Sequence, residues 1–185
     1  MDIQRVSAIK TVSALPRFYQ DTIVFTTMRT LAFIAALAFA LTTQAQTPTN
    51  PYYSRMATNK LNVSDAAWKK VLPSGVFQVA RQEATERAFT GEYYKTKTPG
   101  TYHCAVCGNA LFSSSAKYDS GTGWPSFWKP IHPGAVKDIP DADGSRTETE
   151  CARCGSHLGH VFTDGPQPTG LRYCMNSAVL ELVKK

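Results

Sequence analysis

Long apolar runs and blocks of one charge are scarce in this 185-residue sequence. The longest apolar run extends from Leu31 to Leu41, about half of the roughly 20 residues that a membrane-spanning helix needs. The formal net charge is +6, yet no lysine or arginine block is present, so nucleic-acid binding is not indicated. After residue 98 the runs are short and separated by turns rich in glycine, proline and aspartate. The sequence therefore predicts a mainly β protein without stable membrane insertion, rather than a helical bundle.

Residues 1–45 are predicted to be an N-terminal extension and a secretory signal peptide rather than part of the fold. Met28 and Arg29 precede the apolar run and Thr-Gln-Ala follows it, which is typical of a signal peptide cleaved after Ala45. Residues 1–27 are interpreted as extra sequence ahead of a start at Met28. We therefore expect an exported protein, either periplasmic or secreted. An organelle such as the mitochondrion is the alternative, since basic residues are mixed with serine and threonine upstream.

The remaining chain is expected to form one domain over residues 61–185, preceded by a flexible lead-in at 46–60. Two short helices should open the domain. The first is capped by Ser64 and stopped by Pro73, and the second extends from Gly75 to Phe89. Candidate strands of an antiparallel sheet system follow at residues 102–104, 110–113, 146–151, 160–163, 171–175 and 178–183.

The five cysteines sort into two C-x-x-C pairs and a single remainder. The pairs are Cys104 with Cys107 and Cys151 with Cys154. Each pair is followed by a glycine, which suits the tight turn of a metal knuckle. Four thiolates are the tetrahedral ligand set of structural zinc, so the sequence predicts one Zn²⁺ that clamps two distant hairpins together. Two disulfides are the alternative in an exported protein, and C-x-x-C pairs can also be redox dithiols.

Cys174 has no partner and is the candidate nucleophile, because an odd cysteine in an exported chain suggests a reactive thiol. Arg172 and Asn176 lie two residues to either side, so in a strand all three side chains project from one face. A guanidinium beside a thiol favours the thiolate. Three further polar residues lie upstream across a Gly-Pro turn and could return antiparallel to this strand: His157, His160 and Asp164. Cysteine with histidine pairs a nucleophile with a proton carrier.

The two histidines need a local irregularity to act together, since residues three apart point to opposite faces of a regular strand. A bulge at Gly159 would let His157 and His160 converge on one site. Without that bulge, one of the two is expected to be a structural hydrogen-bonding residue.

With these residues in place, the chain resembles the methionine-R-sulfoxide reductases, the MsrB family, over roughly residues 60–183. The shared features are the two C-x-x-C pairs, SGTGWPSF at 120–127, HLGHVFTDGP at 157–166 and RYCMNSAVL at 172–180. The resemblance implies two antiparallel sheets with short N-terminal helices, and zinc held away from the active centre. It also implies an enzyme that reduces the R epimer of methionine sulfoxide in oxidised proteins and so repairs them under oxidative stress.

The resemblance assigns roles to individual residues. Cys174 matches the nucleophile, and Trp124 matches the aromatic wall that receives the methyl group of the substrate. The other matches are the active-site histidines His160 and His157, the polar residues Asn176 and Arg172, and the carboxylate of Asp164. In the implied reaction the Cys174 thiolate attacks the sulfoxide sulfur, His160 helps to protonate the oxygen directly or through a water, and a sulfenic acid remains. Without the resemblance, Trp124 would be interpreted as a packing residue.

The chain departs from many family members at Thr122, where they carry a second, resolving cysteine. The other four cysteines are assigned to zinc, so no thiol remains to form an internal disulfide with Cys174. An external reductant, either a thioredoxin-like protein or a small thiol, is therefore expected.

Two other functions remain open from the sequence. A non-catalytic, zinc-stabilised β module that binds a partner protein would need Cys174 to be buried and ordinary. A cysteine-histidine acyl-transfer enzyme is weaker, because no signature of such a family is present.

Overall fold

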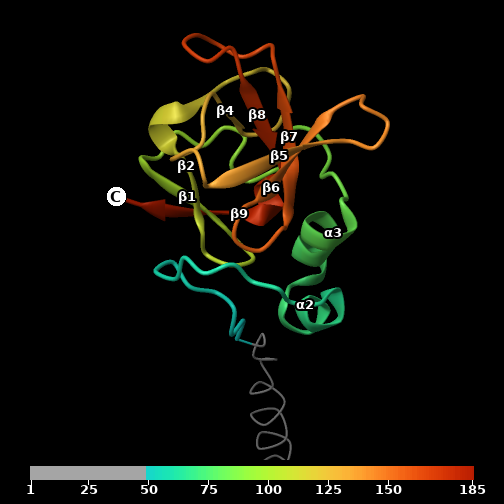
Figure 1. The fold of residues 1–185 in the computed structure, drawn as a ribbon. Helices are drawn as coiled ribbons and strands as arrows, with labels where there is room; N and C mark the ends of the chain where they lie inside the picture. The colour runs from blue at the N-terminus through green and yellow to red at the C-terminus, as the bar shows by residue number, and fades with distance from the viewer. Residues whose placement is uncertain (1–48) are drawn as a thin grey trace, which may run out of the picture. The chain divides into compact units, whose positions relative to one another are not determined.

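The computed structural model describes residues 49–185, and Figure 1 shows short helices beside a body of β-strands. The predicted signal peptide, its cleavage after Ala45 and the interpreted start at Met28 lie outside the described residues. Across residues 49–185, no helix has the length and apolar character needed to cross a membrane.

Helix α2 (Asp65–Val71) begins where the sequence predicts. The Ser64 hydroxyl accepts a hydrogen bond from the Ala67 amide, and Trp68 is buried on the inner face of the helix. The second helix, α3 (Ser74–Gln82), was predicted to reach Phe89, and that prediction is wrong. Glu83 ends the helix in the left-handed conformation, with φ of 55°.

Tertiary hydrogen bonds explain why the chain after Glu83 is not helical. The Glu86 amide donates to the Asn176 side chain at 3.1 Å, and the Glu86 carbonyl accepts from the Trp124 indole, also at 3.1 Å. These backbone groups would bond within the segment if the helix continued, so the segment exchanges helical hydrogen bonds for contacts with the β-sheet.

Two antiparallel sheets form the body of the domain, as predicted. The smaller has the order β2-β1-β9, and the larger has the order β3-β4-β8-β7-β6-β5. The strands of the smaller sheet are β1 (Gly100–Cys104), β2 (Ala110–Ser113) and β9 (Leu180–Lys184). Those of the larger are β3 (Lys117–Tyr118), β4 (Ser126–Phe127), β5 (Val136–Pro140), β6 (Thr147–Cys151), β7 (His157–Phe162) and β8 (Arg172–Met175). Short 3-10 turns, η1 (Ser114–Ala116) and η2 (Ser177–Val179), precede β3 and β9.

Three strands of the larger sheet were not predicted. The four residues of β5 after Val136 are exposed, so the strand lacks the alternation of buried and exposed residues that reveals a half-buried strand. Strands β3 and β4 contain two residues each, too few to show a period.

Aromatic side chains join the two sheets. Phe112 from β2 stacks on Phe127 from β4 with ring centroids 4.4 Å apart, and Tyr102 from β1 meets Phe127 edge-on at 5.0 Å. All three rings are fully buried. Burial of each large apolar side chain contributes about 1.5–3 kcal/mol, so this cluster holds the larger sheet firmly against the smaller one.

Candidate active site and metal centre

Strand β8 places Cys174 between its neighbours on the larger sheet. Cys174 is directly opposite Ser126 on β4 and His160 on β7. Directly opposite residues of antiparallel strands project from the same face of a sheet. The register therefore sets a hydroxyl on one side of the Cys174 thiol and an imidazole on the other.

The bulge that would bring the two histidines together is present. Gly159 pairs with Thr149 while His157 pairs with Glu150, so Leu158 is the extra residue of β7. Gly159 has φ of 154°, and a Cβ there would lie 2.1 Å from the Cys174 carbonyl oxygen, so only glycine fits. The ring centroids of His157 and His160 are consequently 5.4 Å apart.

A cavity of about 160 Å³ opens beside the Cys174 sulfur. Residues from separate parts of the chain line it, including Trp124, Arg146, His160, Phe162, Cys174 and Asn176. Cys174 is half-buried, unlike the fully buried cysteines of the two pairs. Trp124 is also half-buried, and its indole N–H donates to the Glu86 carbonyl, which leaves the ring free to form an apolar wall. The site thus offers a sulfur nucleophile, an aromatic surface and an imidazole around one small space.

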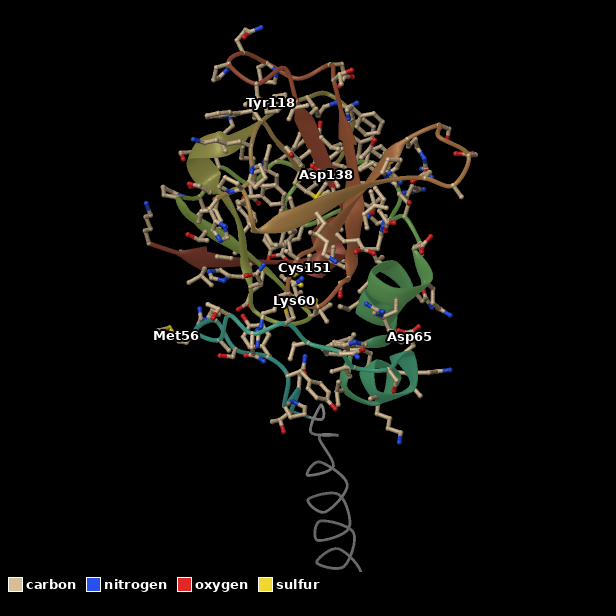
Figure 2. The ribbon with its side chains drawn as sticks, in the orientation of Figure 1. Met56, Lys60, Asp65, Tyr118, Asp138 and Cys151 are labelled. Carbon is tan, nitrogen blue, oxygen red and sulfur yellow. The ribbon has the colours of Figure 1, made fainter. Side chains whose placement is uncertain are left out.

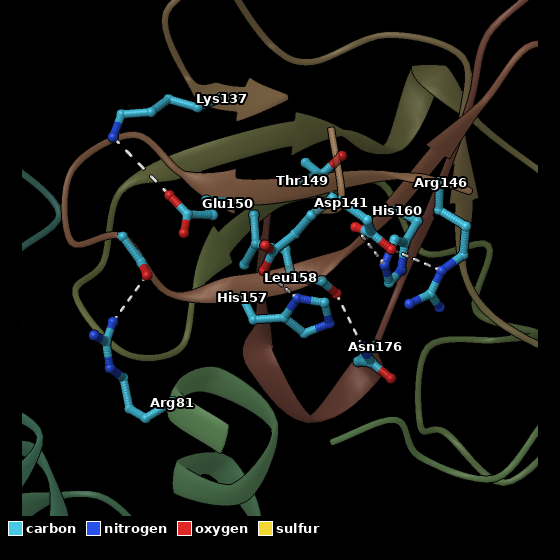
Figure 3. Close-up of polar contacts among 12 residues, drawn as sticks. Arg81, Lys137, Asp141, Arg146, Thr149, Glu150, His157, Leu158, His160 and Asn176 are labelled. Atoms are coloured by element: carbon cyan, nitrogen blue, oxygen red, sulfur yellow. Dashed lines mark hydrogen bonds and ion pairs between the residues drawn. The ribbon is translucent and has the colours of Figure 1, made fainter. Parts of the chain in front are cut away.

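A second, larger cavity of about 540 Å³ adjoins the first and shares His160 and Arg146 with it. His157 lines this larger cavity, and its Nδ1 donates to the Glu148 carboxylate at 2.6 Å. Asp141 accepts a hydrogen bond from Arg146 at 3.0 Å and lies 3.8 Å from Nε2 of His160 (Figure 3). His157 is therefore held by a carboxylate, whereas His160 is the histidine that reaches the cavity containing Cys174.

Burial lowers the pKa of His160 below its ordinary value, and the nearby positive charge of Arg146 lowers it further. Asp141 opposes this shift without cancelling it. At neutral pH the imidazole of His160 is therefore neutral and able to accept a proton.

Arg172 and Asp164 form a two-pronged ion pair, with N–H···O distances of 2.8 and 2.9 Å. The Arg172 guanidinium also lies over the Phe162 ring, 4.2 Å from its centroid. The Arg172 hydrogen bonds hold the pKa of Asp164 below its usual range, and Asp164 in turn raises the pKa of Arg172. Neither residue lines the 160 Å³ cavity, so both lie at the edge of the site rather than inside it.

Asn176 is buried, and both its side-chain nitrogen and its side-chain oxygen form hydrogen bonds. Its amide donates to the Leu158 carbonyl at 3.1 Å (Figure 3), and its oxygen accepts from the Glu86 amide. The Glu86 carboxylate then accepts from the amides of Ser177 and Ala178, at 2.6 and 3.1 Å. Glu86 was missed from the sequence because it lay inside the helix predicted to reach Phe89. It is the residue that connects the Trp124 wall with the strand end that follows Cys174.

The two C-x-x-C pairs form a separate centre. All four sulfurs lie within 4.8 Å of one another, and the cysteines are buried. Sulfur distances across the pairs are 3.8 Å from Cys104 to Cys154 and 3.7 Å from Cys107 to Cys151. These match the edge of a tetrahedron with metal–sulfur bonds of about 2.3 Å, and they exceed the roughly 2.05 Å of a disulfide. The residues therefore fit a four-thiolate metal site and leave no open coordination position.

Residues 49–60, expected to be a flexible lead-in, contain no helix or strand and lie along this centre. The Ser54 amide donates to the Cys107 carbonyl at 3.0 Å. The Arg153 guanidinium donates to the carbonyls of Ser54, Asn59 and Cys107. Arg153 is buried beside the thiolates and joins both pairs to this segment, whereas Met56 projects into solvent (Figure 2).

Comparison with known proteins identifies relatives across most of the described chain. A family model, the SelR domain, matches residues 72–184. A protein of Pseudomonas aeruginosa named peptide methionine sulfoxide reductase MsrB is 55% identical over 121 residues, which cover 64% of this chain and 92% of the relative. Its namesake in Leptospira interrogans is 53% identical over 128 residues, 68% of this chain and 98% of the relative. The chloroplastic peptide methionine sulfoxide reductase B1 of Oryza sativa is 55% identical over 126 residues, 66% of this chain and 58% of that protein.

Proposed function

Since the chain belongs to the MsrB family and is a peptide-methionine (R)-S-oxide reductase, we propose that Cys174 performs the reduction through a sulfenic acid. The observation that carries this proposal is the half-buried Cys174 sulfur, which shares a small cavity with Trp124 and His160. A non-catalytic module would need an ordinary, buried Cys174, and the exposure of this sulfur argues against that alternative.

Substrate selection follows from the two sides of the cavity. Methionine sulfoxide carries an apolar methyl and a polar oxygen on one sulfur. The Trp124 ring receives the methyl, and the oxygen faces the His160 imidazole on the opposite side. Because the sulfur is pyramidal, exchanging its oxygen and lone pair would direct the oxygen away from the imidazole. Such a two-sided site accepts one epimer, which family membership identifies as R.

The chemical step uses one thiol proton. Neutral His160 takes the proton of Cys174, directly or through a water, and the thiolate attacks the sulfoxide sulfur. The imidazolium then returns the proton to the oxygen. The hydroxyl moves to the Cys174 sulfur while the new S–S bond and the S–O bond of the substrate break, and methionine leaves. One thiol and one sulfoxide thus give one sulfenic acid and one thioether, a two-electron reduction of the substrate.

Regeneration then requires an outside thiol. Thr122 lies 3.7 Å from the Cys174 sulfur, at the position where the family resemblance implies a resolving cysteine, and the other four cysteines are buried together. A small thiol or a thioredoxin-like protein attacks the sulfenic acid, water leaves, and a second thiol releases Cys174 from the mixed disulfide. Mass spectrometry after one equivalent of substrate should detect Cys174 sulfenic acid, and an internal Cys174 disulfide would contradict this route.

We assign Zn²⁺ to the four-cysteine centre, held by Cys104, Cys107, Cys151 and Cys154. Bound there, the ion supplies structural stability. The centre has no open ligand position, so no substrate atom needs to reach the metal. Metal analysis of the purified protein tests its identity, with one zinc per chain expected.

We also propose that the protein is exported and meets oxidised substrates outside the cytoplasm or in an organelle. The support is the signal-like segment that ends at Ala45. N-terminal sequencing of the mature protein should begin at Gln46, and an intact segment from 28 to 45 would contradict export.

The central test is Cys174→Ser with a peptide that carries each sulfoxide epimer separately. We expect the wild type with a small dithiol to reduce the R epimer, and the variant to lose at least about 1,000-fold in rate because serine is a far weaker nucleophile. Metal content and melting temperature of the variant should match the wild type. Loss of either would indicate a structural Cys174.

A further inference from the structure

Three hydroxyl groups form a chain that ends at the Cys174 sulfur. The Thr122 hydroxyl lies 3.7 Å from that sulfur and 2.8 Å from the hydroxyl of Ser120. Ser120 lies 2.7 Å from the hydroxyl of Ser126, which is 3.3 Å from the backbone carbonyl of Trp124. The chain thus connects the reactive sulfur with a fixed acceptor inside the sheet.

The backbone that carries this chain is held tightly. Gly121 and Gly123 adopt φ of 73° and 93°, and the Gly121 amide donates to the Asp119 side chain at 3.0 Å. The Gly123 carbonyl accepts from the Phe89 amide at 2.8 Å, and Ser126 is buried directly opposite Cys174. The loop therefore fixes where the oxygens lie and leaves the direction of each O–H bond as the free variable.

One set of O–H directions gives every hydroxyl of the chain an acceptor. The Trp124 carbonyl can only accept, and in this set the single Ser126 proton points to it. Ser120 then donates to Ser126, which leaves the Ser120 oxygen as an acceptor for Thr122. The one Thr122 proton has two acceptors within reach, the Ser120 oxygen and the Cys174 sulfur.

We infer that Thr122 is a further catalytic residue whose hydroxyl changes direction with the protonation state of Cys174. When Cys174 is a thiol, its S–H donates to Thr122, and Thr122 donates to Ser120. When Cys174 is a thiolate it can only accept, and Thr122 rotates its proton to the sulfur. Ser120 then still accepts from the Thr122 amide at 3.4 Å, so the rotation costs little.

The consequence for the reaction rests on the proposed function. A hydrogen bond from Thr122 stabilises the thiolate relative to the thiol, and it lowers the intrinsic nucleophilicity of each thiolate by a smaller factor. Thr122 therefore occupies the position of a resolving cysteine but has a different role. It stabilises the Cys174 thiolate before the reaction, whereas a resolving cysteine would reduce the sulfenic acid afterwards.

The test is the pH dependence of Cys174 alkylation by iodoacetamide in the full-length, metal-loaded protein, followed by mass spectrometry of the Cys174 peptide. Thr122→Val removes the hydroxyl and keeps the shape. Its alkylation midpoint should rise by about one pH unit, and its rate at high pH should exceed the wild-type rate about threefold. Thr122→Ser keeps the hydroxyl and should leave the midpoint within about 0.3 of a pH unit of the wild type. An unchanged midpoint in Thr122→Val would overturn the assignment.

A second variant gives a shift of opposite sign. Ser120→Ala removes the competing acceptor, so the Thr122 proton is left to the sulfur and the alkylation midpoint should fall. A rise in Ser120→Ala would mean that loop disorder, and not hydrogen-bond direction, controls the thiol, and an unchanged midpoint would also overturn the proposal. Alkylation requires no sulfoxide, so this readout stays valid even if the protein fails to reduce methionine sulfoxide.

Discussion

The chain uses the same side chain in two opposite settings. Four cysteines lie in the metal centre with 0–6% of their surface exposed, and Asn109 donates to the Cys151 sulfur at 3.6 Å. Cys174 lies on strand β8 of the larger sheet, half-buried beside a cavity, with the Thr122 hydroxyl as its polar neighbour. The four metal-site cysteines are therefore inaccessible to a substrate, whereas a substrate can reach Cys174 through the cavity beside it.

The backbone produces this difference. The metal-site cysteines lie at tight turns, where Gly108 and Gly155 adopt φ of 83° and 63° and direct four sulfurs toward one point. Cys174 lies inside strand β8, where the sulfur projects from one face of the sheet and meets only what the neighbouring strands place there. A complete set of four cysteine ligands stabilises the fold. The exposed face of the sheet at Cys174 instead leaves the sulfur able to react.

The largest expected effect comes from breaking the closed setting. Cys151→Ser removes one thiolate, and structural zinc contributes on the order of 10–16 kcal/mol in small domains, comparable to the whole stability of a protein. We expect loss of metal and of the cooperative unfolding transition, measured by elemental analysis and calorimetry. Cys174→Ser is the matched control and should keep both. If Cys151→Ser retained its metal and its melting temperature, Cys151 would not be a structural metal ligand, and the contrast with Cys174 would fail.

Much of this contrast is readable from the sequence. The C-x-x-C spacing predicts the metal centre, because two such pairs can supply four thiolates to one metal ion. The alternation of Arg172, Cys174 and Asn176 predicts the strand, and Gly159 marks the bulge that brings the histidines together.

Other parts of the site depend on distant contacts that leave no local pattern. The Glu86 carbonyl meets Trp124 and its carboxylate meets Ser177, far along the chain, so the helix predicted through Glu86 gave no indication of either contact. Strand β5 is exposed over most of its length, so its sequence has no alternation of apolar and polar residues. It is a strand because it pairs with β6.

The bulge at Gly159 offers a way to damage the open setting alone. In Gly159→Ala the new Cβ meets the Cys174 carbonyl, so the β7 and β8 backbones must separate. We expect a destabilisation of about 2–4 kcal/mol in urea unfolding, and a rate loss of about 100-fold because His160 and Cys174 move apart. Gly170→Ala is the matched control, since Gly170 has φ of 70° and open space around its Cβ position, and should cost only about 1 kcal/mol with little loss of rate. Equal effects in the two variants would mean that the bulge does not place the histidine.

The smallest expected effect is a shift in the pH dependence of activity that leaves the metal centre unchanged. In the proposed mechanism neutral His160 accepts the proton, and burial with Arg146 lowers its pKa, so kcat/KM should rise with pH through a value below 6.5. The depressed pKa also means that the unfolded chain binds more protons, so stability falls as the pH drops through this same window.

Arg146→Gln removes one cause of the lowered His160 pKa and should move the acid limb of kcat/KM upward by a fraction of a pH unit, toward 6.5. Lys137→Gln is the control, because Lys137 pairs with Glu150 and lines neither cavity, and its profile should match the wild type. The metal content should stay constant across this range in both variants, and an acid limb that does not move in Arg146→Gln would assign the proton transfer to a group other than His160.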